Sequence, residues 1–250
     1  MHERVNDFPW VRGWKRLLVK IALNYQRRIL LNAKAIISET LKVAMSVENF
    51  YSNDGLKCTD IFPGLEGKEF RRYAERGNSI ALLSYWNEVK FPDAYIPIFK
   101  TIGNYKFIMI GEWTSQSYKN DFLKKLLLEG VLDRVVLNER VSEKRKIDLL
   151  SNSKFFIRFG LGELGTSYRT VGALEWETPV IVNEELGISD YLKKYSNSLI
   201  VSDVSKVEEI RKFIESNDNP VSYGNPQGEI MRMIKDHTWE NHCRLLLGGV

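Results

Sequence analysis

The sequence predicts an α/β protein built on a doubly wound, Rossmann-like parallel sheet. Short apolar runs typical of buried strands alternate with amphipathic helical patterns from residue 78 onward. One such strand, at 155–157, leads into a glycine-rich loop, and a helix and a second apolar strand at 179–182 follow. Strand, loop, helix and strand in this order form one βαβ unit, whose two strands run parallel in the same sheet.

The composition is that of a globular protein with an ordinary core. The chain has 250 residues, of which 44% are hydrophobic and 27% charged, and its net charge is +4. Cys58 and Cys243 form neither a metal-binding spacing nor a disulfide framework, which suits a reducing compartment. No apolar run approaches the roughly 18 residues that a spanning helix needs, and no secretory leader is visible. We therefore expect a cytoplasmic protein of one or two domains.

Residues 8–31 are predicted to form a basic amphipathic helix. Apolar residues recur at helical spacing, basic residues interleave with them, and the span contains no acid. Such a helix can lie on an anionic membrane surface, or it can pack on its own domain with its arginines in water. The sequence leaves both interpretations open. We divide the chain into this helical segment, residues 1–34, and a Rossmann-like domain, residues 35–250.

The other elements follow in chain order. We expect a short buried strand at 35–38, with Ser38 capping the next helix, and a second short strand at 59–62 that ends at Pro63. Further strands are expected at 80–83, 106–110, 135–137 and 199–201, because each is a short apolar run. Helices are expected at 68–75, 95–101, 115–129, 142–150, 166–176, 204–216 and 228–247, with Ser142 as a cap, and a loop at 220–226.

The loop at 160–165 is the main candidate site. A glycine loop that leads into a helix presents unpaired N–H groups and the positive end of the helix dipole to an anion, most often phosphate. Its spelling, G-x-G-x-x-G, matches the dinucleotide fingerprint, and Glu184 and Glu185 stand where that fingerprint has an acid for the ribose. A dinucleotide domain usually opens with this loop, whereas here it comes late. A dinucleotide-dependent oxidoreductase and a tight turn without a ligand are therefore alternatives.

Several segments together resemble a known family. They are NAKAIISE at 32–39, DIFPG at 60–64, SYWNEVKFPD at 84–93, VS at 141–142, ELGT at 163–166, TPVIV at 178–182 and HTWE at 237–240. In this order they resemble a family-4 (group 1) retaining glycosyltransferase of the GT-B fold, mainly its C-terminal, donor-binding half. The match covers most of residues 32–248, and the ordered set carries it rather than any single motif.

The resemblance implies that the 35–250 domain binds a nucleoside-diphosphate sugar as donor substrate and transfers its sugar with retention, as a hexosyltransferase does, without a metal or other cofactor. Glu163 matches the family's glutamate near the donor sugar, and Lys90 matches its diphosphate-binding lysine. We expect these two residues to be catalytic. The resemblance also implies that amides of the glycine loop, at Gly165, Thr166 and Ser167, hold the diphosphate.

Other positions depart from the family pattern. The place of the family's diphosphate-binding arginine falls at Ser84 or Tyr85, and Arg158, just before the glycine loop, is our candidate for the missing charge. The place of its ribose-binding glutamate holds Gly172, and Glu175, one helical turn further on, is the candidate substitute. The resemblance places a base-proximal loop at Asn138, Val141 and Ser142.

The sequence contains little of the N-terminal domain with which such enzymes bind the acceptor. Residues 1–34 resemble the end of that domain. A partner chain, or self-association into a homo-oligomer, would then supply the acceptor side, and the helix would contact a membrane peripherally. The alternative function is a catalytically incomplete donor-binding or assembly subunit. We expect no nucleic-acid partner, because the basic residues gather in one helix without a nucleic-acid-binding motif.

Overall fold

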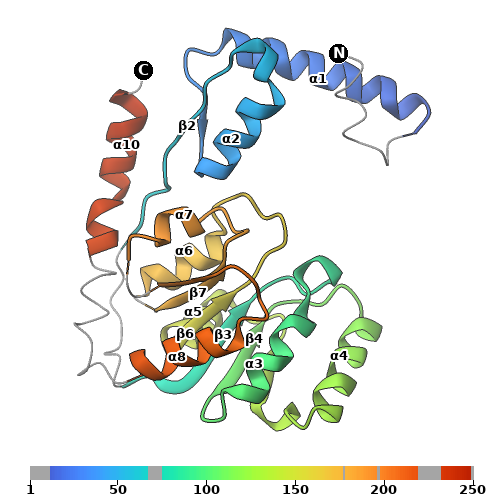
Figure 1. Ribbon diagram of the computed structural model, residues 1–250, viewed down its shortest axis with the longest axis vertical. Helices are drawn as coiled ribbons and strands as arrows, with labels where there is room; N and C mark the ends of the chain where they lie inside the picture. Colours follow the sequence, from blue (N-terminus) through green and yellow to red (C-terminus); the bar gives the residue numbers. More distant parts are fainter. Residues whose placement is uncertain (1–11, 67–74, 177, 196–197, 219–231, 249–250) are drawn as a thin grey trace.

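The main body of the protein is a six-stranded parallel sheet. The computed structural model describes residues 12–66, 75–176, 178–195, 198–218 and 232–248. The strand order is β5-β4-β3-β6-β7-β8, and every neighbouring pair is parallel (Figure 1). The order reverses between β3 and β6, so the chain winds outward in both directions from this pair. The strands are β3 (Gly77–Leu83), β4 (Lys106–Ile110), β5 (Val135–Asn138), β6 (Ser153–Arg158), β7 (Val180–Asn183) and β8 (Ser198–Val201).

Helices cover both faces of this sheet. Alternate residues of β3 point to opposite sides: Ile80 and Leu82 belong to one buried cluster and Ala81 to another. The first cluster contains residues of α3 (Ile96–Thr101), α4 (Gln116–Leu128) and α8 (Val207–Asn217). The second contains residues of α5 (Glu143–Ser151), α6 (Tyr168–Glu175) and α7 (Ser189–Leu192). The predicted doubly wound α/β fold is therefore confirmed, and so is Ser142 as the cap of α5, since its Oγ accepts from Arg145 N at 3.2 Å.

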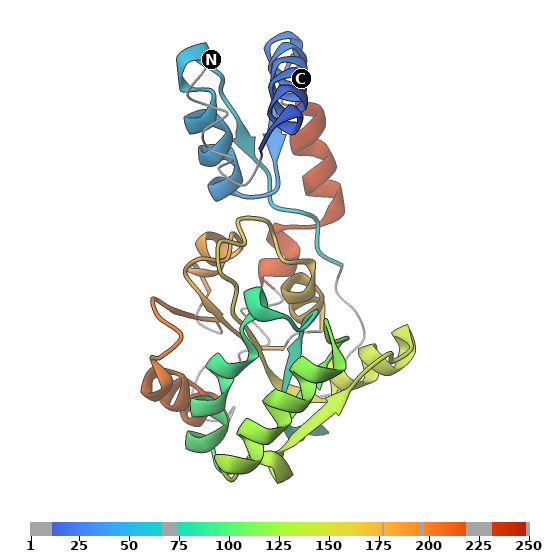
Figure 2. The same cartoon turned by 90° about the vertical axis from the view of Figure 1, so that its right-hand side faces the viewer.

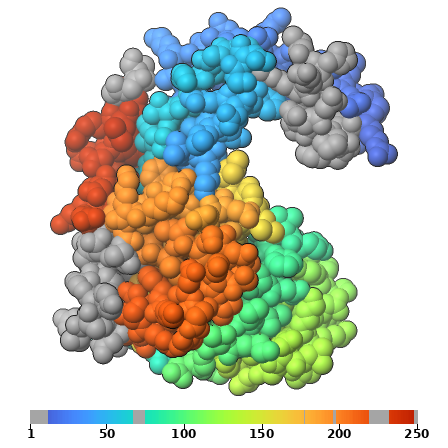
Figure 3. Space-filling model, in the orientation of Figure 1, coloured from blue at the N-terminus to red at the C-terminus, as the bar shows by residue number. Residues whose placement is uncertain are grey.

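A small lobe, residues 14–60, stands apart from the sheet (Figures 1 and 2). It contains α1 (Trp14–Asn32), β1 (Ile37–Ser38), α2 (Leu41–Phe50) and β2 (Thr59–Asp60), and its two strands pair only with each other in the described structure. In Figure 3, α1 (blue) extends above the main body, and α2 (lighter blue) contacts the main body. The division of the chain at residue 35 stays a prediction.

Two expectations for the small lobe are wrong. The strand expected at 35–38 shortens to two residues, and Ile37 is 39% exposed, because a two-stranded sheet has too little surface above it to bury both faces. The helix after it is capped by Thr40, whose Oγ1 accepts from Val43 N at 3.2 Å, while the Ser38 hydroxyl donates to Thr40 O at 2.8 Å.

The long C-terminal helix expected at 228–247 is interrupted. Residues 232–236 are helical, the chain turns at His237, and α10 (Trp239–Gly248) then runs beside the small lobe (Figure 2). At the interruption Leu65 N donates to His237 O at 2.6 Å, so the two segments that cross between the lobes are paired. A Cβ on Gly64 would lie 2.4 Å from the Trp239 ring, which explains a glycine at this crossing. The loop expected at 220–226, and the helix expected at 68–75 except Glu75, lie outside the described residues.

Candidate anion-binding site at the switch point of the sheet

The candidate site lies where the winding of the sheet reverses. In open α/β sheets, ligands bind beyond the carboxyl ends of the strands at this point. Here it lies between β3, which ends at Leu83, and β6, which ends at Arg158. The loop after β3 carries Lys90, and the loop after β6 is the glycine loop with Glu163. The fold therefore brings the two segments that the sequence singles out to one edge of the sheet.

Three of the predicted site residues form one charged cluster. Arg158 Nη2 lies 2.7 Å and Lys90 Nζ 2.6 Å from the same oxygen, Glu163 Oε2. Arg158 Nη1 also donates to Ser84 Oγ at 2.9 Å. The side chain of Arg158 is 1% exposed, whereas those of Lys90 and Glu163 are 19% and 21% exposed. Two cations share one carboxylate, so the cluster has a net positive charge and its open side is reached through Lys90 and Glu163.

The cations set the protonation of Glu163. Burial favours the neutral acid, but the hydrogen bond from Lys90 and the charge of Arg158 outweigh burial and hold the pKa of Glu163 below its ordinary value. The Glu163 carboxylate is therefore ionised at neutral pH and stabilises the fold.

This stabilisation should depend on pH. Since the folded-state pKa of Glu163 is lowered, its contribution is complete above the unfolded-state pKa of about 4.3 and disappears as the pH falls through the folded value. At about pH 6.5 we expect Glu163→Gln to lower the free energy of unfolding by about 1–2 kcal/mol, and the difference from wild type to shrink toward about pH 3.5. Urea denaturation at both values measures it. Glu129→Gln, which removes an exposed carboxylate paired with Lys100, is the control. A difference that does not change with pH would contradict the assignment.

The loop after β3 is held firmly around Lys90. The Asn87 side chain accepts from Lys90 N at 2.9 Å and so caps the short 3-10 turn η3 (Glu88–Lys90). Trp86 is 1% exposed, and its backbone N–H donates to Glu112 O at 2.8 Å. The backbone from Trp86 to Lys90 is therefore held in place by the protein itself.

The glycine loop is braced by the end of β7. Asn183 makes two hydrogen bonds with Gly160: its Oδ1 accepts from Gly160 N at 3.0 Å, and its Nδ2 donates to Gly160 O at 2.8 Å. Glu185 Oε2 accepts from Gly162 N at 2.8 Å. Gly187 N donates to Glu163 O at 2.9 Å, at an approach so close that a Cβ on Gly187 would lie 1.8 Å from Leu164 O. Glu185, one of the two acids of the dinucleotide interpretation, thus holds the loop itself.

The end of the loop carries backbone N–H groups without an acceptor among the described residues. Ser167 has a left-handed φ of 55° and leads directly into α6. In the part of the chain that the structure describes, the backbone N–H groups of Gly165, Ser167 and Tyr168 meet no acceptor. Unpaired amides at a helix N-terminus, next to the positive end of the helix dipole, attract an anion. Glu163, the carboxylate that the two cations share, lies two residues before Gly165, so the charged cluster and these amides belong to the same loop.

The remaining predicted site residues lie elsewhere. Glu175 is at the far end of α6, where its Oε1 accepts from Glu66 N at 3.2 Å. Asn138 ends β5, two strands from β3, and the Ser142 hydroxyl is engaged in its cap. Val141 packs against the second core cluster. These residues do not join the cluster, and their binding roles stay predictions.

A separate cavity of about 260 Å³ lies between α5 and α6. It is lined by Leu83, Glu143, Lys146, Tyr168, Arg169 and Glu175, among others. Sequence reasoning overlooked Arg169, whose pKa is lowered by burial and by the positive charge of Arg158. The feature that could have identified it is an arginine in the first turn of a predicted helix, where the helix dipole disfavours a positive charge. Arg169 adds a third positive group to this edge of the sheet.

Comparison with known proteins supports the fold. No family model matches the sequence, and no curated protein matches it in sequence. Among the described residues, no three His, Cys, Asp or Glu side chains come together as a metal site requires. Many solved structures match the fold, and GT-B glycosyltransferases are among them, so the chain has the fold of that class over most of its length.

Three similar structures illustrate the relationship. The crystal structure of TarM matches with a TM-score of 0.68 and 14% identity, over 90% of this chain and 45% of TarM. HepE from Anabaena, in complex with UDP and glucose, matches with a TM-score of 0.71 and 12% identity, over 96% of this chain and 68% of HepE. The GtfA/B complex matches with a TM-score of 0.67 and 14% identity, over 90% of this chain and 47% of the matched chain. The chain thus spans about half to two thirds of these proteins.

Proposed function

We propose that the chain is a glycosyltransferase of the hexosyltransferase type that uses a nucleoside-diphosphate sugar. The observation that carries this proposal is the cluster of Arg158 and Lys90 around Glu163, next to the unpaired amides before α6. Loss of the sugar leaves extra negative charge on the departing diphosphate, and fixed cations and N–H groups stabilise that charge. Glu163, held ionised between the cations, would face the donor sugar.

In this proposal, Arg158 takes the place of the arginine that the family carries in the loop corresponding to the one after β3. Its guanidinium bonds to Ser84, one of the two candidate positions for that arginine, so the charge would reach the same place from the neighbouring strand. Lys90, Arg158 and the amides of Gly165 to Ser167 would hold the diphosphate. With these groups in place we propose that no metal ion is needed, and that the sugar is transferred with retention.

The proposed site for the nucleoside is the cavity next to the charged edge of the sheet. The cavity between α5 and α6 begins beside Ser142 and includes Glu175, and we propose it for the base and ribose. Solved structures of HepE contain UDP with glucose and UDP-glucose, which supports UDP as the first nucleotide to test. Calorimetric titration of the purified chain with UDP, GDP, ADP and NAD tests the proposal. Binding of one nucleoside diphosphate supports it, and saturable binding of NAD alone would favour the oxidoreductase alternative.

Lys90→Ala should weaken binding of UDP. The alanine removes the ammonium group and with it a charge-assisted hydrogen bond to phosphate, which is worth about 1.5–3 kcal/mol. We therefore expect the affinity for UDP to be about 10- to 100-fold lower than in wild type. Lys100→Ala, which removes an exposed lysine of α3 paired with Glu129, is the matched control. Calorimetry measures both variants. Unchanged affinity for Lys90→Ala would remove Lys90 from the diphosphate site.

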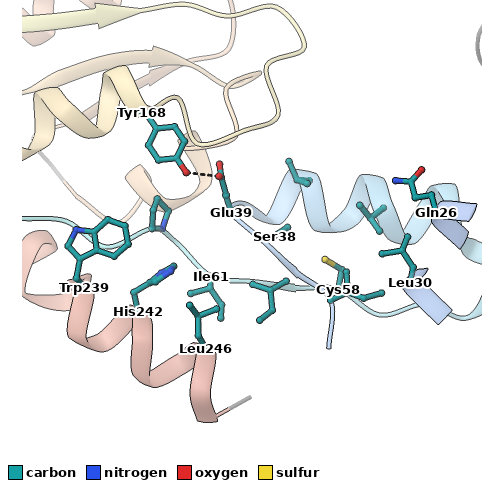
Figure 4. A pocket seen from close by; sticks show the side chains of 15 residues that line it. Gln26, Leu30, Ser38, Glu39, Cys58, Ile61, Tyr168, Trp239, His242 and Leu246 are labelled. Carbon is teal, nitrogen blue, oxygen red and sulfur yellow. Dashed lines mark hydrogen bonds between the residues drawn. The ribbon is translucent and has the colours of Figure 1, made fainter. Parts of the chain in front are cut away.

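We further propose that a partner polypeptide, either another protein or a second copy, supplies the acceptor side. A two-stranded sheet is marginal alone, and a mostly apolar cavity of about 630 Å³ lies between α1, α2 and α10 (Figure 4). The GtfA/B complex, as its name states, contains two components. Light scattering measures the oligomeric state. Robust sugar transfer by the purified monomer would contradict the need for a partner and the idea of a catalytically incomplete subunit.

The helix α1 is proposed to contact a membrane surface peripherally, on a cytoplasmic protein. None of its described side chains is buried, and Trp14 and Tyr25 are 70% and 68% exposed beside several lysines and arginines. Within the described residues, no helix has the length and apolar character needed to cross a bilayer. Sedimentation with anionic vesicles tests the contact, and an equal result with neutral vesicles would argue against an electrostatic attachment.

A further inference from the structure

The start of α2 in the small lobe is fastened to loops of the main body. Thr40, which is fully buried, donates through Oγ1 to Leu164 O at 2.6 Å. Lys42 Nζ donates to Leu186 O at 2.9 Å and to Ser189 Oγ at 2.8 Å. The first of these contacts reaches the glycine loop, and the other two reach the segment that braces it after β7.

Glu39, the residue before Thr40, contacts the end of the glycine loop on both sides of Ser167. Its Oε2 accepts from Thr166 Oγ1 at 2.8 Å, and its Oε1 accepts from Tyr168 OH at 2.6 Å (Figure 4). The hydrogen bond with Tyr168 lowers the pKa of Glu39 and raises that of Tyr168, so the carboxylate is charged and the phenol stays protonated. One carboxylate therefore holds two hydroxyl groups that flank the left-handed Ser167.

We infer that Glu39 is a positioning residue for the diphosphate site: by holding Thr166 and Tyr168 it fixes the turn at Ser167 and aims the unpaired amides before α6. This inference rests on the proposed function, because those amides are the groups proposed to bind the donor phosphates. Glu39 does not touch the donor. Preorganised donors stabilise an anion more than donors that must first be ordered, because the ordering cost is avoided.

The sign of its effect distinguishes positioning from simple electrostatics. A negative charge near a diphosphate repels it, so a residue that acted only through its charge would weaken donor binding. Removing that charge would then strengthen the binding of UDP. If Glu39 instead orders the amides, its removal weakens the binding of UDP although a repulsive charge has been lost.

The test uses Glu39→Gln, Tyr168→Phe and the double variant of the full chain. The glutamine has the shape of glutamate but no charge, so the two charge-assisted hydrogen bonds from the hydroxyl groups are replaced by weaker neutral ones, and one hydroxyl group must turn to accept from the amide nitrogen. We expect about tenfold weaker binding of UDP by calorimetry for Glu39→Gln. The loss in the double variant should be smaller than the product of the two single losses, because the residues act as one pair. Glu215→Gln, an exposed carboxylate of α8 paired with Arg211, is the control and should bind UDP as wild type does.

Two further readouts separate positioning from general damage to the fold. Binding of uridine, which lacks phosphates, should fall less than binding of UDP in Glu39→Gln when both are followed by ligand-observed NMR, although Tyr168 also lines the cavity proposed for the nucleoside. Hydrogen exchange of the amides of Thr170 and Val171, which donate to Ser167 O, should be faster in the free variant, while exchange in β3 and β6 stays as in wild type. Tighter UDP binding, an equal loss of uridine binding, or unchanged exchange at Thr170 and Val171 would each overturn the inference. If the wild type binds no UDP, the donor proposal fails, and the exchange measurement still decides the role of Glu39.

Discussion

Arg158→Met should abolish most of the binding of UDP and lower the stability of the fold. The guanidinium is almost fully buried and bonds to Ser84 and Glu163, and among the described residues no other side chain bonds to both. Its loss leaves a half-buried carboxylate with one cation instead of two and removes a positive charge that is proposed to attract the diphosphate. We expect UDP affinity to fall at least about 100-fold, and the free energy of unfolding to fall by about 3 kcal/mol.

The comparison with Arg158→Lys makes this prediction specific. Lysine keeps the charge but lacks the planar fork with which arginine bonds to two partners, so we expect a loss of intermediate size. Arg145→Met, on the exposed face of α5, removes an arginine whose side chain pairs with its helical neighbour Asp148 and should change little. Calorimetry and urea denaturation measure the three variants. Wild-type UDP affinity in Arg158→Met would show that the guanidinium is structural only.

Gly111→Ala should lower the stability of the fold strongly. Gly111 follows β4 with a φ of 126°, which side chains rarely adopt, and a Cβ there would lie 1.7 Å from Ser84 O. Backbone atoms cannot rotate away as a flexible side chain does, so the loop after β3 must shift. We expect the free energy of unfolding to fall by about 2–4 kcal/mol. The displaced Ser84 should also weaken the binding of UDP, because it orients Arg158.

Gly103→Ala is the matched control. A Cβ at Gly103 meets no atom within 4 Å, and no positive φ strains an alanine there. Urea denaturation should give wild-type stability for this variant. If Gly111→Ala were equally harmless, the close packing of β4 against the Ser84 loop would not be what holds the site in shape.

The two variants test one structural idea. The proposed site is formed where loops from neighbouring strands interlock, and its charges are fixed by backbone contacts as much as by each other. Gly111→Ala, which displaces the backbone of the loop after β3, and Arg158→Met, which removes a charge, should therefore both reduce nucleotide binding. Of the two substitutions of Arg158, the lysine should preserve more of the binding than the methionine.

The sequence by itself determined the main elements of the larger domain. Apolar runs located the strands of the six-stranded sheet to within a few residues, and Ser142 was correctly identified as a cap, because strand periodicity and capping depend on neighbours in the chain. The glycine loop was recognisable for the same reason. Patterns were less reliable for the small lobe, where Thr40 caps in place of Ser38 and the strand at Ile37 is exposed.

Only the tertiary structure decided which of these residues meet. Lys90 and Glu163 are far apart in the sequence. They come together because β3 pairs with β6 as well as with β4, so the loops after β3 and β6 are neighbours. Arg158 reaches Ser84 by the same strand order, and Glu39 reaches Tyr168 because the small lobe rests on α6. The terminal helix breaks at His237 because that segment pairs with Leu65. The local sequence determines the hydrophobic periodicity of each helix or strand. The contacts between elements depend on the order of the strands and on the position of the small lobe, which no single segment of the sequence determines.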